Sequence, residues 1–242
     1  MRLEQYHRET RDLTVSVFFV GPLLAFYEIG SLALDSEVRN GADVLLRSLF
    51  ALFGSRGVTV FNLILLGIAI WAGIRVIRRD RPVFALMAPV LVESVLLAIF
   101  FAPVVLLFES RILPYLQAEA AGGIVSGPTM FEHLVLSAGA GVYEEILFRL
   151  LLVGSMVALM VRAARLKVWF ASVVAIAVSS VGFAAFHHVG VYGEPFEVHA
   201  FLFRTIAGVL LAGIFVVRGF AVAVYTHFLY DVLVYLQAGA AS

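Results

Sequence analysis

The chain has 242 residues, of which 62% carry hydrophobic side chains and only 14% are charged. Its mean hydropathy of +1.01 lies well outside the range of soluble globular proteins, so the sequence predicts an integral membrane protein. Basic and acidic residues balance at 17 each, and nucleic acid is not expected as a partner because no concentrated basic patch is present. The absence of cysteine excludes disulfides, thiolate zinc sites and a cysteine nucleophile.

Seven segments are long and apolar enough to cross a bilayer, since a spanning helix needs about 20 mostly apolar residues. They lie near residues 13–34, 58–77, 83–108, 131–161, 168–188, 197–217 and 219–237. The first is predicted to span the membrane and not to be a cleaved signal peptide, because no small-residue cleavage site follows its long apolar run. The fold class expected is therefore an all-α, polytopic transmembrane helix bundle of about seven spans.

The connections between these segments differ in length and polarity. Residues 36–57 are too polar to span a membrane, but the stretch DVLLRSLFALF within them is amphipathic and is predicted to lie in the membrane interface. Residues 109–130 form a second long connection, rich in Gly and Pro. The last two spans are separated only around Arg218 and Gly219, which predicts a tight antiparallel hairpin.

The distribution of Lys and Arg predicts the orientation of the bundle, because cytoplasmic loops carry an excess of these residues. With the N-terminus inside, most loop arginines and Lys167 lie on the inner side. The outer side then receives Arg39, Arg47, Arg56 and Arg111. We therefore expect a multi-pass protein of the cell membrane (inner or plasma membrane), with a cytoplasmic N-terminus and the C-terminus outside.

Several ionisable groups remain inside the predicted spans. Each costs about 3 kcal/mol there on insertion scales, so such groups usually face a cavity or pair with one another. They are Glu28, Glu93, Glu144, Glu145, Arg149, His187, His188, Arg204, His227 and Asp231. For Glu28, Glu93 and Arg204, the spacing does not separate an ion pair, a shared cavity and a transport path, and a structural role is favoured.

The stretch GVYEEILFRL, residues 141–150, places three charges in one apolar helix. Residues four apart lie on the same face of an α-helix, whereas neighbours are about 100° apart. Glu145 and Arg149 can therefore pair, which leaves Glu144 pointing elsewhere without a partner on its own helix. The spacing thus predicts a structural pair beside an unpaired carboxylate.

Two other spans offer polar faces at the same spacing. His227 and Asp231 share a face of the last span, and Phe183 and His187 share a face of the fifth. A glutamate, two histidines and a second carboxylate that converge on one cavity are the components of a hydrolase that activates water.

Three short motifs carry a resemblance to a known family. EEILFR, FAAFH and HFLYD, in this order and on separate predicted spans, are similar to the EExxxR, FxxxH and HxxxN or HxxxD motifs of the CPBP (CAAX protease and bacteriocin-processing) intramembrane proteases. The resemblance implies a catalytic membrane region of about four spans at residues 131–237. Residues 1–130, with about three spans, resemble the variable part of that family. Such a divergent first half would suit a bacterial, myxosortase-like branch that processes C-terminal sorting signals.

The resemblance also implies a role for each residue of the first two motifs. Glu144 would be the general base that activates water, with Glu145 and Arg149 as a structural pair beside it. His187 would orient that water or carry its proton. Phe183 belongs to the same motif as His187 and would support it.

The third motif departs from the family pattern at one position. His227 and Asp231 would stabilise the oxyanion, but the prenyl-protein endopeptidase branch usually has Asn in place of Asp231. An amide donates hydrogen bonds, whereas an ionised carboxylate only accepts them. Asp231 would therefore hold a proton or orient His227, and the orienting role is favoured. His188 would either contact the site residues from behind or lie at the membrane interface.

Two histidines and two carboxylates could also bind zinc, so Glu144, His187, His227 and Asp231 form an alternative metal set. Because the sequence contains no HExxH motif, the resemblance favours a glutamic endopeptidase without a cofactor. Its substrates would be membrane-anchored proteins or peptides with a C-terminal transmembrane or lipidated segment, cleaved near the C-terminal end.

Two other functions compete with the protease. Buried Glu, His and Arg on several spans also build the proton relays of transporters, although the sequence shows no inverted repeat. A scaffold or immunity protein without proteolytic activity could share the fold. One geometric tension concerns His187, which would lie near the outer surface if its span begins near Lys167, while Glu144 would lie nearer the middle. A shifted helix or a cavity open to the outer face would bring them together.

Overall fold

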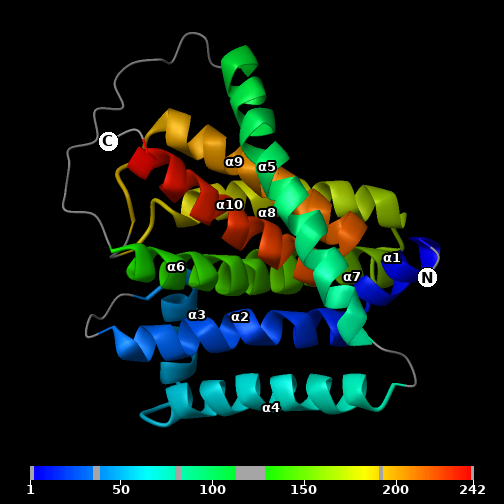
Figure 1. Cartoon of the computed structure of the whole chain (residues 1–242). Coiled ribbons are helices and arrows are strands. Elements are labelled where there is room, and N and C mark those ends of the chain that lie inside the picture. Colours follow the sequence, from blue (N-terminus) through cyan, green and yellow to red (C-terminus); the bar gives the residue numbers. More distant parts are fainter. Residues whose placement is uncertain (1–2, 35–38, 80–82, 113–128, 191–192, 241–242) are drawn as a thin grey trace.

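The structure, a computed structural model, describes residues 3–34, 39–79, 83–112, 129–190 and 193–240 (Figure 1). Throughout these residues the chain forms helices and no strand. They are α1 (Leu3–Thr10), α2 (Leu13–Ala33), α3 (Gly41–Ala51), α4 (Gly57–Ile77), the 3-10 helix η1 (Val83–Leu86), α5 (Met87–Ile112), α6 (Met130–Gly139), the π-helix η2 (Ala140–Val153), α7 (Gly154–Arg162), α8 (Val168–Phe186), α9 (Val198–Arg218) and α10 (Phe220–Ala240).

Among the described residues, 6 helices are long and apolar enough to cross a membrane, namely α2, α4, α5 with η1, α8, α9 and α10. The remaining predicted span, near residues 131–161, corresponds to α6, η2 and α7, which follow one another without a gap from Met130 to Arg162. It is divided because its middle 14 residues are π-helical. The chain is thus an all-α, multi-pass membrane protein, as the sequence predicts.

Helix α10 lies in the middle of the bundle and joins its two halves (Figure 1). Its residues Val222 and Val224 are fully buried in the main hydrophobic cluster, which also contains Val15 of α2 and Val142 of η2. The Tyr225 hydroxyl donates to the carbonyl of Phe19 on α2 at 2.8 Å. Residues on both sides of the predicted boundary near residue 130 therefore share one core; residues 113–128, in the second long connection, lie outside the described residues.

The predicted hairpin between the last two spans is confirmed, since Gly219 alone separates α9 from α10. Gly219 has φ +98°, a backbone conformation that residues other than glycine rarely adopt. A Cβ atom there would also lie 3.1 Å from the Cα atom of Arg11. The glycine therefore permits both the turn and the close approach of the segment between α1 and α2.

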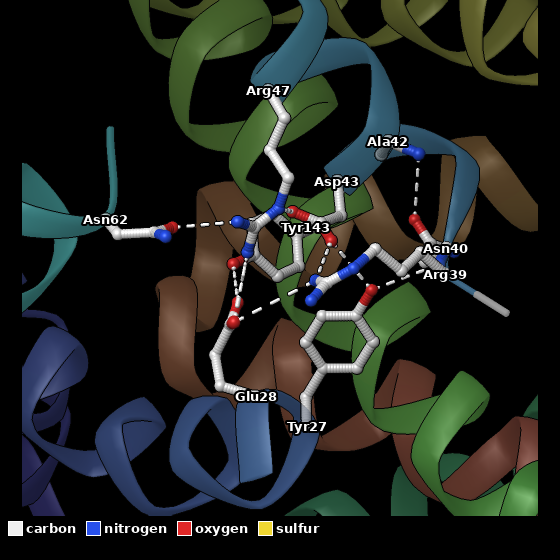
Figure 2. A network of polar contacts seen from close by, with 9 residues as sticks. All are labelled: Tyr27, Glu28, Arg39, Asn40, Ala42, Asp43, Arg47, Asn62 and Tyr143. Carbon is white, nitrogen blue, oxygen red and sulfur yellow. Dashed lines mark hydrogen bonds and ion pairs between the residues drawn. The ribbon is translucent and has the colours of Figure 1, made fainter. Parts of the chain in front are cut away.

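Helix α3, the predicted amphipathic segment, is held against α2 and η2 by the polar network of Figure 2. Buried Asp43 accepts hydrogen bonds from Arg39 at 2.8 Å, from Arg47 at 2.5 Å and from the Tyr27 hydroxyl at 2.9 Å. Arg47 also donates to Glu28 at 2.8 Å. Burial lowers the pKa of the Arg47 guanidinium, but attraction by Asp43 and Glu28 outweighs it, so the pKa is raised and Arg47 stays charged.

A second polar cluster ties α1 to α5 and α9 near the other end of the bundle. Glu93 accepts a hydrogen bond from the Tyr6 hydroxyl at 2.7 Å and one from Arg218 at 2.6 Å. The Arg218 guanidinium also lies 5.3 Å from the centroid of the Tyr6 ring. Glu28 and Glu93 thus both pair with arginines that hold helices together, which is the structural role that the sequence favours.

Candidate active site

The sequence-predicted site residues come together on three helices in the C-terminal half. Glu144, Glu145 and Arg149 lie on η2, Phe183 and His187 at the end of α8, and His227 and Asp231 on α10. The four predicted catalytic residues line one cavity of about 220 Å³; they are Glu144, His187, His227 and Asp231. The tension between the depths of Glu144 and His187 disappears in the structure, because both side chains reach this cavity.

Helix η2, which carries both glutamates, is a π-helix. The backbone N–H of Gly154 donates to the carbonyl of Arg149, an i to i−5 bond that widens the turn. Successive residues are then separated by less than the about 100° of an α-helix. Glu145 pairs with Arg149 as the spacing predicts, whereas Glu144 lies near Nε2 of His227 on α10 and Glu145 near Nδ1 of the same ring.

His227 is the centre of the site. Its Nδ1 atom lies 2.8 Å from Glu145 Oε1, and because an ionised carboxylate only accepts, Nδ1 carries the proton. The other ring nitrogen, Nε2, lies 3.9 Å from Glu144 Oε2 and 3.7 Å from Asp231 Oδ2. Glu145 makes a hydrogen bond that orients the ring, while Asp231 lies within ion-pair distance of Nε2 but too far for a hydrogen bond, and its orienting role stays a prediction.

Arg149 lies behind Glu145, away from the solvent. Its side chain is 1% exposed, and Nη1 lies 3.2 Å from Glu145 Oε1 at the i,i+4 spacing that the sequence gives. The guanidinium also lies 4.5 Å from the centroid of the Phe183 ring. A chain of contacts thus runs from Phe183 through Arg149 and Glu145 to His227.

His187 is fixed by the end of its own helix. Its Nδ1 atom lies 2.8 Å from the carbonyl oxygen of Phe183, which can only accept, so Nδ1 carries the proton. Its Nε2 atom then faces Glu144 Oε2 at 3.9 Å. The next residue, His188, is turned away from this cavity, and its Nδ1 lies 3.2 Å from the carbonyl of Glu194. His188 therefore holds the connection between α8 and α9.

These contacts bring the three motifs together in one site. Residues 126–233 match the model of a family described as type II CAAX prenyl endopeptidase Rce1-like. This region is similar to that family. The resemblance to the CPBP proteases is therefore confirmed over residues 126–233, and it supports in general an intramembrane endopeptidase activity of the CAAX type, which implies membrane-anchored protein substrates. No curated protein and no solved structure matches the chain.

One site residue lies outside the Rce1-like region and was not predicted. Asn40 donates from Nδ2 to Glu144 Oε1 at 2.8 Å, while its own Oδ1 accepts from the backbone N–H of Ala42 at 2.9 Å. Its backbone N–H donates to the Tyr27 hydroxyl at 3.1 Å (Figure 2). Asn before a helix is a familiar N-cap signal, which could have located the start of α3 but not its contact with a glutamate far along the chain.

Two further cavities adjoin the protease site. One, of about 370 Å³, is lined by Asn40, Ser48 and Glu194 and meets the first cavity at Glu144 and His187. The other is an apolar groove of about 510 Å³ between η2 and α8. It shares Leu45, Phe186 and Val189 with the second cavity. Neighbouring cavities with common lining residues therefore lie between the apolar groove and Glu144.

The alternative metal set, Glu144, His187, His227 and Asp231, stays a prediction. No group of three or more His, Cys, Asp or Glu side chains there has the geometry to hold a metal ion. Glu144 Oε2 lies 3.9 Å from the Nε2 atom of each histidine, while His227 Nδ1 is already bonded to Glu145. No metal-dependent step is therefore derived from these residues.

Proposed function

We propose that this protein is a glutamic endopeptidase in which Glu144 activates a water molecule. The observation that carries this proposal is the position of Glu144 Oε2, 3.9 Å from Nε2 of both His187 and His227. Separations of this size are too long for direct hydrogen bonds and suit polar groups that share a water molecule. Asn40 holds the other carboxylate oxygen of Glu144, so Oε2 faces the histidines.

The reaction follows from this arrangement. Glu144 takes a proton from water, whose oxygen forms a bond with the carbonyl carbon of the scissile peptide. The Nε2–H of doubly protonated His227 donates to the oxyanion, and Glu145 and Asp231 balance the positive charge of the ring. Glu144 then returns its proton to the leaving nitrogen as the C–N bond breaks. His187 holds the attacking water through Nε2, since Nδ1 is bonded to the carbonyl of Phe183.

The apolar groove supports an approach of the substrate from the bilayer. Leu147, Leu151 and Phe186 line it, and it leads through the shared residues Leu45 and Val189 towards Glu144. A substrate that keeps a transmembrane or lipidated segment in the bilayer would place that segment in this groove and pass its backbone to the glutamate. We therefore propose that the enzyme trims membrane-anchored proteins near their C-terminal end, as a myxosortase-like enzyme would.

The decisive test is Glu144→Gln, which keeps the shape of the side chain but removes the base. We expect intact folding, intact binding of a membrane-anchored peptide, and cleavage reduced by about 100-fold or more. His187→Ala and His227→Ala should cause similar losses, and the losses should not add because the groups act together. Full cleavage by Glu144→Gln would remove Glu144 as the base.

The same assay separates the rival mechanisms. The purified protein is assayed in liposomes with and without a strong chelator, and its metal content is measured. Zinc at one equivalent, lost together with activity, would replace the glutamate mechanism by a metal-dependent one. Ion flux without proteolysis would instead favour the transporter.

The orientation in the cell membrane remains the one that the loop charges predict. Reporter fusions after Arg79 and after Lys167 should map to the cytoplasm, and a fusion at the C-terminus should map outside. In this orientation the end of α8, and with it His187, lies towards the outer side. If the C-terminal fusion maps to the cytoplasm while the other two also do, the number of spans between Lys167 and the C-terminus is wrong, most simply at the hairpin of residues 195–220.

A further inference from the structure

Arg204 of α9 lines the same cavity as Glu144, His227 and Asp231. Its Nη2 donates to Glu194 Oε2 at 2.7 Å. Its Nη1 is buried and has no hydrogen-bond partner among the described residues. A buried donor without a partner costs about 1–3 kcal/mol, so the guanidinium is left half satisfied beside the reaction site.

The partner of Arg204 is easily replaced. The side chain of Glu194 is 59% exposed, whereas that of Arg204 is only 18% exposed. Glu194 therefore loses little when it turns to water, while Arg204 needs an acceptor where it stands. The planar fork of a guanidinium matches the two oxygens of a carboxylate. Glu194 thus occupies one of the two guanidinium nitrogens, Nη2, that together could bind a carboxylate, and leaves Nη1 free to bind one.

The remaining wall of this cavity is apolar. Phe101, Phe203, Leu211 and Tyr230 line it beside Arg204. With a volume of about 220 Å³, the cavity is below the usual range for drug-sized ligands and suits a short peptide end with apolar side chains. A carboxylate that enters such surroundings must be paired with a cation, and Arg204 supplies it.

We propose that Arg204 binds the α-carboxylate at the C-terminal end of the substrate, and that Glu194 holds the guanidinium ready by occupying part of the fork. This inference rests on the proposed function, because the cavity is shared with the reacting groups. It distinguishes the two kinds of substrate: a lipidated segment would lie in the apolar groove while the few released residues lie against Arg204, whereas a C-terminal transmembrane segment would carry the free terminus away from this cavity. The enzyme would accordingly require a free C-terminus close to the scissile bond.

The first experiment measures binding, so that it does not depend on catalysis. Full-length protein in detergent is titrated with three fluorescent peptides of about three residues, and anisotropy gives the affinity. One ends in a free carboxylate, one in an amide, and one in an amide with a Glu side chain in the last position. We expect the free acid to bind at least about 10-fold more tightly than the amide, as one charge-assisted hydrogen-bond pair would give.

Variants test whether the preference for the free acid over the amide depends on Arg204. Arg204→Gln should bring the ratio of acid to amide affinity close to one, and Arg204→Lys should keep part of it, because the charge remains without the fork. Glu194→Gln is the matched control: it removes the competing carboxylate, so the ratio should stay or increase. Melting temperature and elution profile show that each variant is folded.

Several outcomes would overturn the proposal. They are equal binding of acid and amide by the wild type, an unchanged ratio in Arg204→Gln, or a lost ratio in Glu194→Gln. Equal binding of the peptide with the Glu side chain would show a general carboxylate site and contradict the assignment to the C-terminus. Full cleavage by Glu144→Gln together with an intact acid preference would refute the proposed base and leave this subsite standing.

Discussion

Each half of the molecule carries a carboxylate and an arginine at i,i+4 spacing, and the two pairs lie in different surroundings. Arg149 and Glu145, in the Rce1-like half, have side chains exposed by 1% and 0%, and Arg149 has no hydrogen-bond partner among the described residues. Arg47 instead donates to both Asp43 and Glu28, and the side chain of Glu28 is 30% exposed. Removing Arg149 therefore leaves a fully buried carboxylate whose remaining partner is His227, whereas Asp43 and Glu28 belong to a network that keeps several donors.

The largest effect expected from this comparison is on stability. Arg149→Ala should lower the free energy of unfolding by about 3–5 kcal/mol, because the fully buried Glu145 carboxylate loses its guanidinium and keeps only the hydrogen bond from His227. Arg47→Ala should cost about 1 kcal/mol, since Asp43 keeps its hydrogen bonds from Arg39 and Tyr27. Thermal unfolding in detergent and the yield of monodisperse protein measure both.

The outcome for Arg149 also decides its role. A folded Arg149→Ala protein of normal stability but without activity would move Arg149 from support to direct contact with the substrate. A large loss of stability in Arg47→Ala would show that the network around α3 is as intolerant of an unpaired charge as the interior of the bundle.

The parts of the fold and the site that depend on local spacing could be predicted from the sequence. The spans, the hairpin at Gly219 and the pairing of Glu145 with Arg149 follow from apolar length and helical periodicity. The contact between Glu145 and His227 was not predicted, because it depends on how η2 packs against α10, which the spacing along one helix does not show. Gly141 illustrates that packing, since a Cβ atom there would lie 2.9 Å from the carbonyl oxygen of Val224 on α10.

Contacts between distant segments were the other gap. Asn40 is separated from Glu144 by 104 residues, and nothing in the local sequence around it distinguishes it from an ordinary helix cap. Similarly, Glu194 pairs with Arg204 through the fold of the connection between α8 and α9. Both cases need the tertiary structure, because the spacing of the residues carries no helical period that relates them.

The second prediction tests whether the N-terminal half contributes to catalysis through Asn40. Asn40→Ser keeps an N-cap oxygen but loses the reach to Glu144, so kcat should fall about 10-fold while KM and stability change little. Asn40→Asp also keeps the cap but places a carboxylate against Glu144, and its activity should be lower still. The assay is cleavage of a membrane-anchored peptide in liposomes.

A second asparagine of the same network provides the control for Asn40. Asn62 accepts from Arg47 at 2.8 Å at an exposed position, so Asn62→Ser should leave kcat unchanged. Equal activity of Asn40→Ser and wild type would mean that α3 supports the fold without positioning Glu144. If Asn40→Ser lowers kcat only together with a clear fall in melting temperature, the loss of activity would come from unfolding, and Asn40 would have a structural role alone.

The smallest effect is expected at Asp231, where the Rce1-like half departs from the Asn of the prenyl-protein endopeptidase branch that it resembles. Asp231 Oδ2 lies 3.7 Å from His227 Nε2, and Glu145 already fixes the ring, so we expect the orientation of the ring to depend little on Asp231. An amide in its place can donate to the oxyanion, which offsets the lost negative charge.

Asp231→Asn should therefore keep kcat within about threefold of wild type, whereas Asp231→Ala, which removes both functions, should lower it about 10-fold. The two variants are compared in the liposome assay after their folding has been checked. If Asp231→Asn is as impaired as Asp231→Ala, the negative charge beside His227 is itself required for the reaction.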